Sequence, residues 1–407
     1  MGYGWAAERA MNSAQPLYDL APLLRMLAMG ALIALVPLAW VLWRNRGAQR
    51  SRRWQALTVL TLFLTFDLVL FGAFTRLTDS GLGCPDWPGC YGNASPLGAH
   101  ADISAAQTAL PSGPVTHGKA WVEMVHRYLA TSVGALITVL AVAAWLGRRR
   151  ARRAGGRALD GPSPGWATLT LVWVCVQGAF GALTVTMKLF PAIVTLHLAG
   201  GVVLLALLCV QAVRQTAVGA EDRAMPQPAG LRKLAWLGLA MLSLQVLLGG
   251  WVSTNYAVLA CSSFPTCQGS WWPDMNFAQG FSLWRPLGVL SDGRPIDFSA
   301  LTAIHYTHRL FAYAVFVVLG FLAWRLHRAG VGVRPRQARW LAGLLLLQFI
   351  TGLSNVVLDW PLLAAVLHTG GAAALVVVLT WILEAQRPRA LAAPAPMVQP
   401  RVVEAHL

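Results

Sequence analysis

Long apolar segments dominate the chain and alternate with short polar ones. About 20 apolar residues suffice to cross roughly 30 Å of hydrocarbon as a helix. Nine segments qualify, at about residues 22–43, 54–77, 119–146, 165–187, 191–213, 231–255, 303–327, 338–359 and 361–385. The first lacks a small-residue cleavage site and runs into a basic loop, so we expect it to be retained rather than removed as a signal peptide. The pattern predicts an all-α polytopic membrane protein.

The composition supports a membrane location. Of 407 residues, 56% are hydrophobic and only 12% are charged, which leaves too little polar surface for a soluble fold of this size. The formal net charge is +16, but the basic residues collect in alternate loops, near 44–53, 148–157, 214–233, 325–339 and 387–401. By the positive-inside rule these loops are cytoplasmic, which places the N-terminus outside and the C-terminus inside a bacterial inner membrane. We therefore expect contact with the lipid bilayer and none with nucleic acid.

Two long loops, about 78–118 and 256–302, are predicted to face outward, and each contains one close cysteine pair. The pairs are Cys84 with Cys90, in GCPDWPGCYG, and Cys261 with Cys267, in ACSSFPTCQG. An oxidising compartment allows such pairs to form disulfides. The alternative is a metal site with four thiolates, which would require the two loops to meet. We favour two separate disulfides.

An internal repeat organises most of the chain. The segment FGAFTRLTDSGLGCPDWPGCYG aligns with LGGWVSTNYAVLACSSFPTCQG, and VEMVHRYLA aligns with IHYTHRLFA. Further on, Gln177, Gly181 and His197 match Gln348, Gly352 and His368 at one constant offset. We therefore predict two parallel-repeat four-helix bundles, related by an axis along the membrane normal. The predicted divisions are an extra helix with a basic loop at 1–53, repeats at 54–213 and 231–385, a cytoplasmic linker at 214–230 and a cytoplasmic tail at 386–407.

Four histidines form the main candidate site. His126, His197, His308 and His368 each lie about six or seven residues past the predicted start of a span. At 1.5 Å per residue this is roughly 10 Å deep, so all four share one layer. A single histidine in a span is more often a satisfied polar residue than a ligand. Four at one depth, two in each repeat, favour ligation.

Haem is the group that best suits these histidines. Neutral imidazole binds iron, copper and zinc, but the carboxylate and thiolate partners usual for zinc and copper are sparse here. Two histidines that face each other across a four-helix bundle form a cradle for a flat macrocycle. The chain has no Cys-x-x-Cys-His motif, so attachment is expected to be non-covalent. Arg127 and Arg309 are candidates for haem propionate contacts, the alternative being that they snorkel to the membrane interface.

Glu123 distinguishes the two repeats. It lies three residues before His126, on the same helix face, whereas its counterpart in the second repeat is His305. A carboxylate at this depth is costly, which makes it a functional candidate. It could exchange protons or stabilise a cation that forms at the haem edge. The alternative is a carboxylate that only forms a salt bridge with a nearby arginine or lysine.

Three other polar residues within the spans rank lower. Asp67 is a second intramembrane acid, but it has no histidine neighbour in the sequence. Cys175 and Cys209 are expected to be small, buried apolar residues. None of the three adds to the candidate haem site.

Taken together, these residues resemble a known family. The region 54–385 contains FGAFTRLTDSGLGCPDWPGC, EMVHR, TLHLAGG, HYTHR and VLHTGG. In this combination the motifs are similar to those of heme A synthase, the membrane enzyme that converts haem O to haem A for cytochrome oxidase. The resemblance implies a core of eight helices in two similar halves. The ninth span, at the N-terminus, departs from that pattern.

The resemblance also implies roles for individual residues. The ligands of the substrate, haem O, would be His126 and His197, and those of a haem b cofactor would be His308 and His368. Glu123 would be the acid needed for catalysis. Cys84 and Cys90 match a pair associated with activity, as a redox relay. The implied reaction is stepwise oxidation of the porphyrin C8 methyl group to a formyl group, with oxygen from water and electrons leaving through haem b.

The expected partners follow from that reaction. Haem O synthase would deliver the substrate, and an electron acceptor that the sequence does not identify would take the electrons. A homo-oligomer is compatible with the sequence. Two other functions compete: a b-type cytochrome that only passes electrons would not need Glu123 or the cysteine pairs, and a transporter built on parallel repeats gives no reason for four histidines at one depth.

Overall fold

The structure is a computed structural model that describes residues 20–154, 163–215, 230–329 and 334–385. These residues form no β-strand, and nine of their helices are long and apolar enough to cross a membrane. The nine are α2 (Ala21–Arg44), α3 (Arg50–Leu77), α5 (His117–Arg153), α6 (Pro164–Thr186), α7 (Pro191–Gln215), α9 (Leu231–Thr254), α11 (Phe298–Ala329), α12 (Arg334–Val357) and α13 (Leu362–Ala385). The predicted all-α, multi-pass membrane protein with nine spans is confirmed. Most of the predicted linker at 214–230 and all of the tail at 386–407 lie outside the described residues.

Local sequence explains where several of these helices begin. Proline occupies one of the first two positions of α2 and α6 and opens α7 at Pro191. The first turn of a helix tolerates proline, because its backbone N–H groups have no partner within the helix. The Thr116 hydroxyl accepts a hydrogen bond from the backbone N–H of Lys119 at 3.3 Å and so caps α5. With this cap α5 starts slightly earlier than predicted, and α11 starts at Phe298 rather than near 303.

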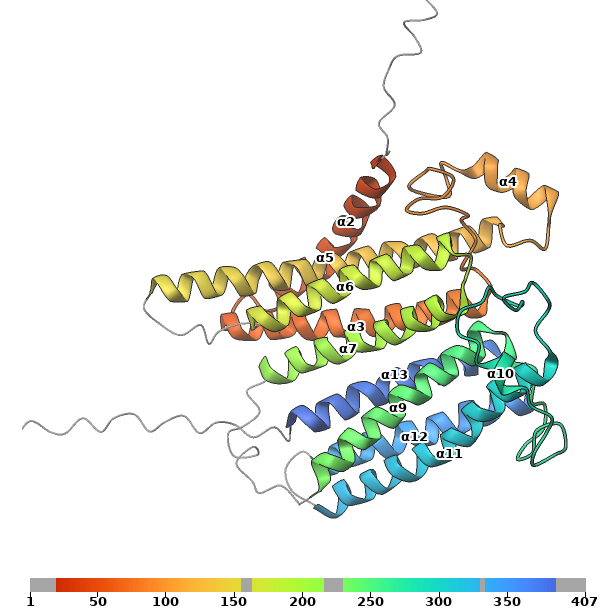
Figure 1. Cartoon of the computed structure of the whole chain (residues 1–407). Coiled ribbons are helices and arrows are strands. Elements are labelled where there is room, and N and C mark those ends of the chain that lie inside the picture. Colours follow the sequence, from red (N-terminus) through yellow and green to blue (C-terminus); the bar gives the residue numbers. More distant parts are fainter. Residues whose placement is uncertain (1–19, 155–162, 216–229, 330–333, 386–407) are drawn as a thin grey trace, which may run out of the picture.

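The eight helices after α2 form two bundles. In the first bundle α3 packs against α5 and α7, and α6 closes the ring by packing against the same two helices. In the second bundle α9 packs against α11 and α13, and α12 closes the ring in the same way. The bundles lie next to each other with their long helices running in similar directions (Figure 1). Helices α7 and α13 line the boundary between them, where α7 contacts α9 and α13, and α13 contacts α3.

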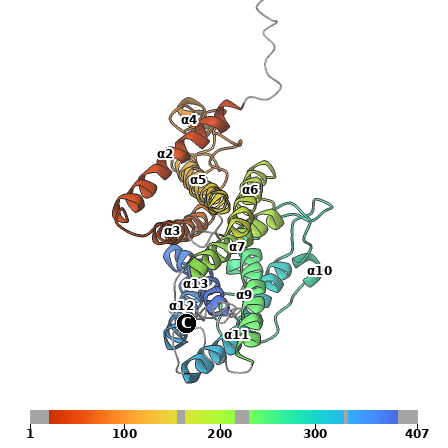
Figure 2. The ribbon, with the colours of Figure 1, turned by 90° about the vertical axis from the view of Figure 1, so that its left-hand side faces the viewer.

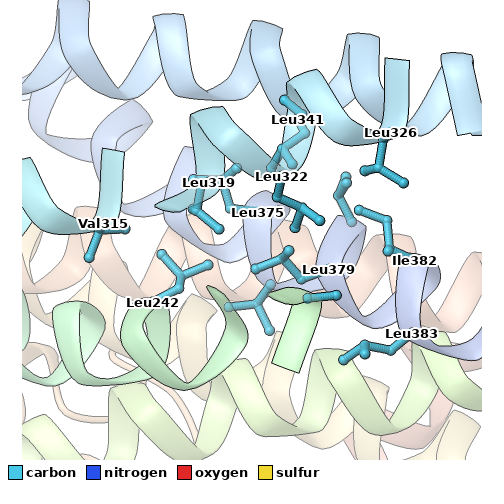
Figure 3. Close-up of a cluster of buried hydrophobic side chains, with 14 of the residues drawn as sticks. Leu242, Val315, Leu319, Leu322, Leu326, Leu341, Leu375, Leu379, Ile382 and Leu383 are labelled. Atoms are coloured by element: carbon cyan, nitrogen blue, oxygen red, sulfur yellow. The ribbon is translucent and has the colours of Figure 1, made fainter. Parts of the chain in front are cut away.

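A leucine-rich core fills the second bundle at the end remote from the long loops. Leu319 and Leu322 of α11 and Leu379 of α13 are fully buried there, together with side chains from α9 and α12 (Figure 3). Gly238 of α9 allows this packing, because a β-carbon added to it would lie 2.7 Å from Cδ2 of Leu319. Leu319 is about three turns along α11 from His308. The apolar core is therefore separate from the histidine layer.

The two long loops gather at one end of the bundles (Figure 1). They contain α4 (His100–Ala109), the 3-10 turn Ala257–Leu259 and α10 (Phe277–Gly280). At this end Arg76 of α3 donates to Tyr256 Oη at 2.9 Å and to the Ser253 carbonyl at 2.7 Å. Burial raises the pKa of the Tyr256 phenol, and the Arg76 charge opposes that rise. Arg76 thus joins the outer ends of the two bundles through hydrogen bonds.

Helix α2 lies outside both bundles and packs obliquely against the first (Figure 2). Its inner face contacts α5 and α3, and Met26 joins a buried cluster with Cys84 and Ile103 of the first long loop. Gly30 is the closest point of approach, since a β-carbon there would collide with Thr131 of α5. The opposite face of α2, including Val36 and Trp43, is exposed. The extra helix therefore buttresses both α5 and the first cysteine loop.

Replacing Gly30 by Ala should lower the thermal unfolding temperature of the detergent-solubilised protein, because α2 must move away from Thr131. The matched control is Gly134→Ala in α5, where an added β-carbon meets no atom within 4 Å. Without a clash, glycine to alanine in a helix stabilises by up to about 1 kcal/mol. The two variants should therefore shift the melting temperature in opposite directions, and equal shifts would show that α2 is not packed as described.

Candidate functional site

The four candidate histidines form two pairs, one in each bundle. His126 of α5 and His197 of α7 are close enough to interact electrostatically, and so are His308 of α11 and His368 of α13. In both bundles the two helices of a pair are diagonal to each other, because each packs on the two remaining helices of its ring. Each pair therefore faces the interior of its own bundle. This is the arrangement expected for a ligand held between two imidazoles.

The depth prediction needs one correction. His197 and His368 lie near the start of their helices as predicted, but His126 and His308 lie about one turn further into theirs. The reason is that α5 and α11 begin earlier than their apolar segments, within polar residues of the long loops. The extra turns of α5 and α11 therefore extend outward, into the long loops.

Each histidine packs on a glycine of a neighbouring helix. A β-carbon added to Gly72, Gly249 or Gly352 would lie 2.9 to 3.1 Å from Cε1 of the facing imidazole, which is tighter than ordinary contact. The facing rings are those of His126, His308 and His368 respectively. Gly181 stands in the same relation to His197, at 3.4 Å. Four glycines thus provide space for four imidazoles at equivalent places in the two bundles.

The histidine rings fit a metal-bound macrocycle in their burial and polarity. All four side chains are half-buried, and the Nδ1 atoms of His126 and His197 are enclosed without a hydrogen-bond partner. The lack of a partner costs free energy at both atoms, and it distinguishes this pair from the pair in the second bundle. Among the described residues no group of three or more His, Cys, Asp or Glu side chains could hold a metal ion. A group bound by two imidazoles, as haem is, matches these pairs.

The second bundle surrounds its histidines with polar side chains. The Gln245 amide nitrogen lies 3.0 Å from Nδ1 of His308 and donates to the His308 carbonyl at 3.1 Å. The Thr351 hydroxyl lies 3.0 Å from Nδ1 of His368, and Gln348 donates to the His368 carbonyl at 2.8 Å. Gln245 and Thr351 were not predicted from the sequence. Comparing the two repeats position by position around each histidine could have found them.

Glu123 is buried, with only 3% of its surface exposed, and both carboxylate oxygens have partners. Oε2 accepts a hydrogen bond from the backbone N–H of Cys84 at 2.7 Å, and Oε1 forms an ion pair with Arg127. The salt bridge considered as an alternative therefore exists. Glu123 is nevertheless also tied to the cysteine loop, one turn from His126. In the second bundle its counterpart, His305, donates from Nδ1 to the Ala257 carbonyl at 3.0 Å.

Arg127 and Arg309 fasten the two cysteine loops to the bundles. Arg127 donates to the carbonyls of Asp86, Pro88 and Gly89. Arg309 donates to the carbonyls of Cys261, Ser263 and Thr266, at 3.1, 2.7 and 2.9 Å. Each guanidinium is a rigid fork with several donors, so it can hold several loop carbonyls at once. These loop contacts use both terminal nitrogens of each guanidinium. The propionate contacts considered for both arginines stay a prediction.

The cysteines form two separate disulfides, Cys84–Cys90 and Cys261–Cys267, as expected. The site with four thiolates is therefore not formed. Cys209 is buried, as predicted, but Cys175 is exposed, and the prediction for it was wrong. Asp67 is half-buried, and no described histidine contact involves it.

Comparison with known proteins agrees with this geometry. Residues 55–380 match the sequence profile of a family described as cytochrome oxidase assembly protein. The chain is 38% identical over 328 residues to the heme A synthase of Shewanella oneidensis, covering 79% of this chain and 93% of that protein. The chain belongs to the heme A synthase family. The resemblance inferred from the sequence motifs is confirmed.

More distant members of the heme A synthase family also align along most of their length. The heme A synthase of a Bradyrhizobium species is 30% identical over 349 residues, covering 80% of this chain and 89% of that protein. That of Caulobacter vibrioides is 28% identical over 366 residues, covering 82% and 96%. The family match begins in α3, so α2 lies outside it.

Replacing Arg309 by Lys should loosen the second cysteine loop, because one ammonium cannot reach all three carbonyls that the guanidinium holds. A hydrogen bond to a charged group contributes about 1.5–3 kcal/mol, so backbone amides in residues 261–270 should exchange with solvent about tenfold faster or more. Arg294→Lys, in an exposed ion pair with Asp292 of the same loop, is the control and should leave exchange unchanged. Equal exchange in both variants would show that Arg309 does not hold the loop.

Proposed function

We propose that the chain is a heme A synthase, which oxidises the C8 methyl group of haem O to a formyl group during assembly of cytochrome oxidase. The observation that carries the proposal is the difference between two otherwise similar histidine pairs. Only the first pair has a buried carboxylate one turn away, and that carboxylate is bonded to the backbone of a disulfide-bridged loop. Membership of the heme A synthase family supports the same conclusion.

In this proposal the first bundle binds the substrate. His126 and His197 ligate the iron of haem O, and the glycines beneath them leave room for the rings. The second bundle binds a haem b cofactor through His308 and His368. Bound haem b supplies one-electron redox chemistry. This division gives each pair one task, because a substrate must enter and leave whereas a cofactor must remain.

The proposed reaction consists of two successive hydroxylations followed by loss of water. In each hydroxylation a C–H bond of the methyl carbon is replaced by a C–O bond with oxygen from water, and two protons and two electrons leave. The second hydroxylation gives a diol carbon that loses water to become the formyl group. Haem b held by His308 and His368 would supply the one-electron chemistry that the oxidation needs, and an external one-electron acceptor would take up the electrons.

Glu123 is the residue that handles a proton in this scheme. Its carboxylate accepts hydrogen bonds from the Cys84 N–H and from Arg127, which fix its position beside the first histidine pair. A carboxylate fixed in this way can accept a proton from the attacking water or stabilise positive charge at the methyl carbon. Movement of the Cys84–Cys90 loop would change the hydrogen bonding of Glu123 directly. The conformation of the Cys84–Cys90 loop could therefore affect the reaction through Glu123.

The proposed membrane orientation follows from charge. The arginine-rich ends of α5 and α11 lie opposite the cysteine loops (Figure 1), so the positive-inside rule places the loops and the histidines toward the outer face. Haem O synthase is the partner proposed to supply the substrate from within the membrane.

Pigment extraction tests the function. Protein purified from cells that make haem O should yield haem b together with haem A or a hydroxylated haem O. Replacing His308 or His368 by Ala should remove the low-spin haem b absorption, because neutral imidazole supplies the axial ligands. Two molecules of haem b per chain and no modified haem would instead identify an electron-carrying cytochrome, and an unchanged spectrum in the histidine variants would rule out this cofactor site.

Replacing Glu123 by Ala or Gln should reduce haem A formation by at least about 100-fold, the usual scale for a group that transfers protons. Substrate haem should stay bound, since His126 and His197 are untouched. Chromatography of extracted haems and the absorption spectrum measure the two quantities. Asp67→Asn, which neutralises the other intramembrane acid, is the control and should keep product formation. Normal haem A from the Glu123 variants would remove this residue from the mechanism.

A further inference from the structure

The two histidine pairs differ at the ring nitrogen that does not ligate a metal. In the first bundle, Nδ1 of His126 and Nδ1 of His197 are buried without a hydrogen-bond partner. In the second bundle, Nδ1 of His368 lies 3.0 Å from the Thr351 hydroxyl. The same repeat therefore provides two different environments for its histidines.

The other hydrogen bond of the Thr351 hydroxyl favours one direction for its contact with His368. The Thr351 hydroxyl donates its proton to the Leu347 carbonyl at 2.8 Å, as threonines in helices commonly do. Its oxygen lone pair is then left to accept a proton from Nδ1 of His368. A neutral imidazole protonated at Nδ1 has its free lone pair on Nε2. Thr351 therefore favours the tautomer of His368 that can bind iron through Nε2.

The counterparts in the first bundle cannot do this. At the constant offset that matches Gly181 with Gly352, Thr351 corresponds to Phe180, whose side chain has no hydrogen-bonding group. The backbone of Gln177 interacts with the His197 ring, but it does not complete a hydrogen bond to Nδ1. Gln245, whose amide nitrogen lies 3.0 Å from Nδ1 of His308, corresponds to Leu68. This contact offers a donor and not an acceptor, so among these contacts the acceptor role belongs to Thr351.

We propose that Thr351 is a positioning residue that holds His368 as a strong, oriented iron ligand, and that the absence of such a group at Phe180 makes the first pair the site that releases its haem. This inference rests on the proposed function. Hydrogen bonds from a ligating imidazole to an acceptor fix the ring and increase its basicity, and losing one typically costs 10–100-fold in metal affinity. A strong ligand pair suits a retained cofactor, and a weaker pair suits a substrate.

The test is Thr351→Val, which keeps the shape of the side chain and removes the acceptor. The low-spin haem of the second bundle should dissociate about tenfold faster or more into an excess of apo-globin scavenger. Its midpoint potential should become more positive, because a less basic imidazole stabilises ferric iron less. A tenfold change in relative stability of the two oxidation states corresponds to about 59 mV for one electron. Thr351→Ser should restore both quantities.

Thr380→Val is the matched control. Thr380 is buried in α13, the helix of His368, and its hydroxyl donates only to the Val376 carbonyl at 2.8 Å. This variant should leave the dissociation rate and the midpoint potential unchanged. If Thr351→Val behaves like Thr380→Val while haem b is present, the inference is wrong and the proposed function stands. If the wild-type second bundle binds no haem, both are wrong.

A reciprocal variant keeps the inference testable if Thr351→Val does not fold. Phe180→Thr places a hydroxyl one residue before Gly181, where the repeat predicts that it reaches Nδ1 of His197. Haemin loaded into the first bundle should then be released about tenfold more slowly than from the wild type. Phe180→Val, which shortens the side chain without adding an acceptor, is its control. Equal release from these two variants would overturn the inference.

Discussion

The close approach of each buried imidazole to a glycine on the neighbouring helix is the contact on which the rest of the structure depends. Any larger residue at Gly72, Gly249 or Gly352 would push the ring away or force the helices apart. Within a bilayer the hydrophobic effect contributes little to helix association, so close van der Waals packing at small residues provides much of the stabilisation. The same glycines that hold the bundles together therefore also determine how much room remains between the diagonal helices.

Contacts with the bundles fix the loops above the histidines, together with the disulfide within each loop and the hydrogen bond from Tyr256 to Asp79 that joins the two loops. Arg127 and Arg309 each follow a candidate ligand directly in sequence, and each holds the carbonyls of a disulfide-bridged loop. Displacement of a ligand histidine is thereby mechanically linked to its loop. In the first bundle Glu123 is a second connection between helix and loop, because it accepts hydrogen bonds from both Arg127 and the Cys84 N–H. In the second bundle His305 makes only a structural contact with a loop carbonyl.

The two bundles share one architecture, and in the proposed function they have two different roles. The bundles share ring order, glycine positions and arginine contacts, which are requirements of packing. They differ at three pairs of corresponding positions: Glu123 and His305, Phe180 and Thr351, Leu68 and Gln245. In the proposed function these differences would alter proton exchange and ligand strength, while the ring order of the bundles stays the same. Helix α2 adds a further asymmetry, since it supports only the first bundle and its loop.

The sequence by itself determined the nine spans, the family, the two disulfides and the four histidines. These features can be read from the sequence because the length of an apolar segment, the spacing of a motif and the placement of charge are local properties. It predicted the start of α11 less well, because that helix begins within polar residues. It also misplaced Cys175, since the apolar sequence of α6 does not reveal which face meets lipid.

Only the tertiary structure decided which groups meet. The bond from the Cys84 N–H to Glu123, the loop contacts of both arginines and the contact between Thr351 and Nδ1 of His368 all join residues from different helices or loops. Such contacts depend on how each helix is rotated about its axis and on the distance between helices to within a few tenths of an ångström. Hydrophobic periodicity specifies neither quantity. Tertiary packing therefore shows which contacts the sequence differences between the two histidine pairs produce.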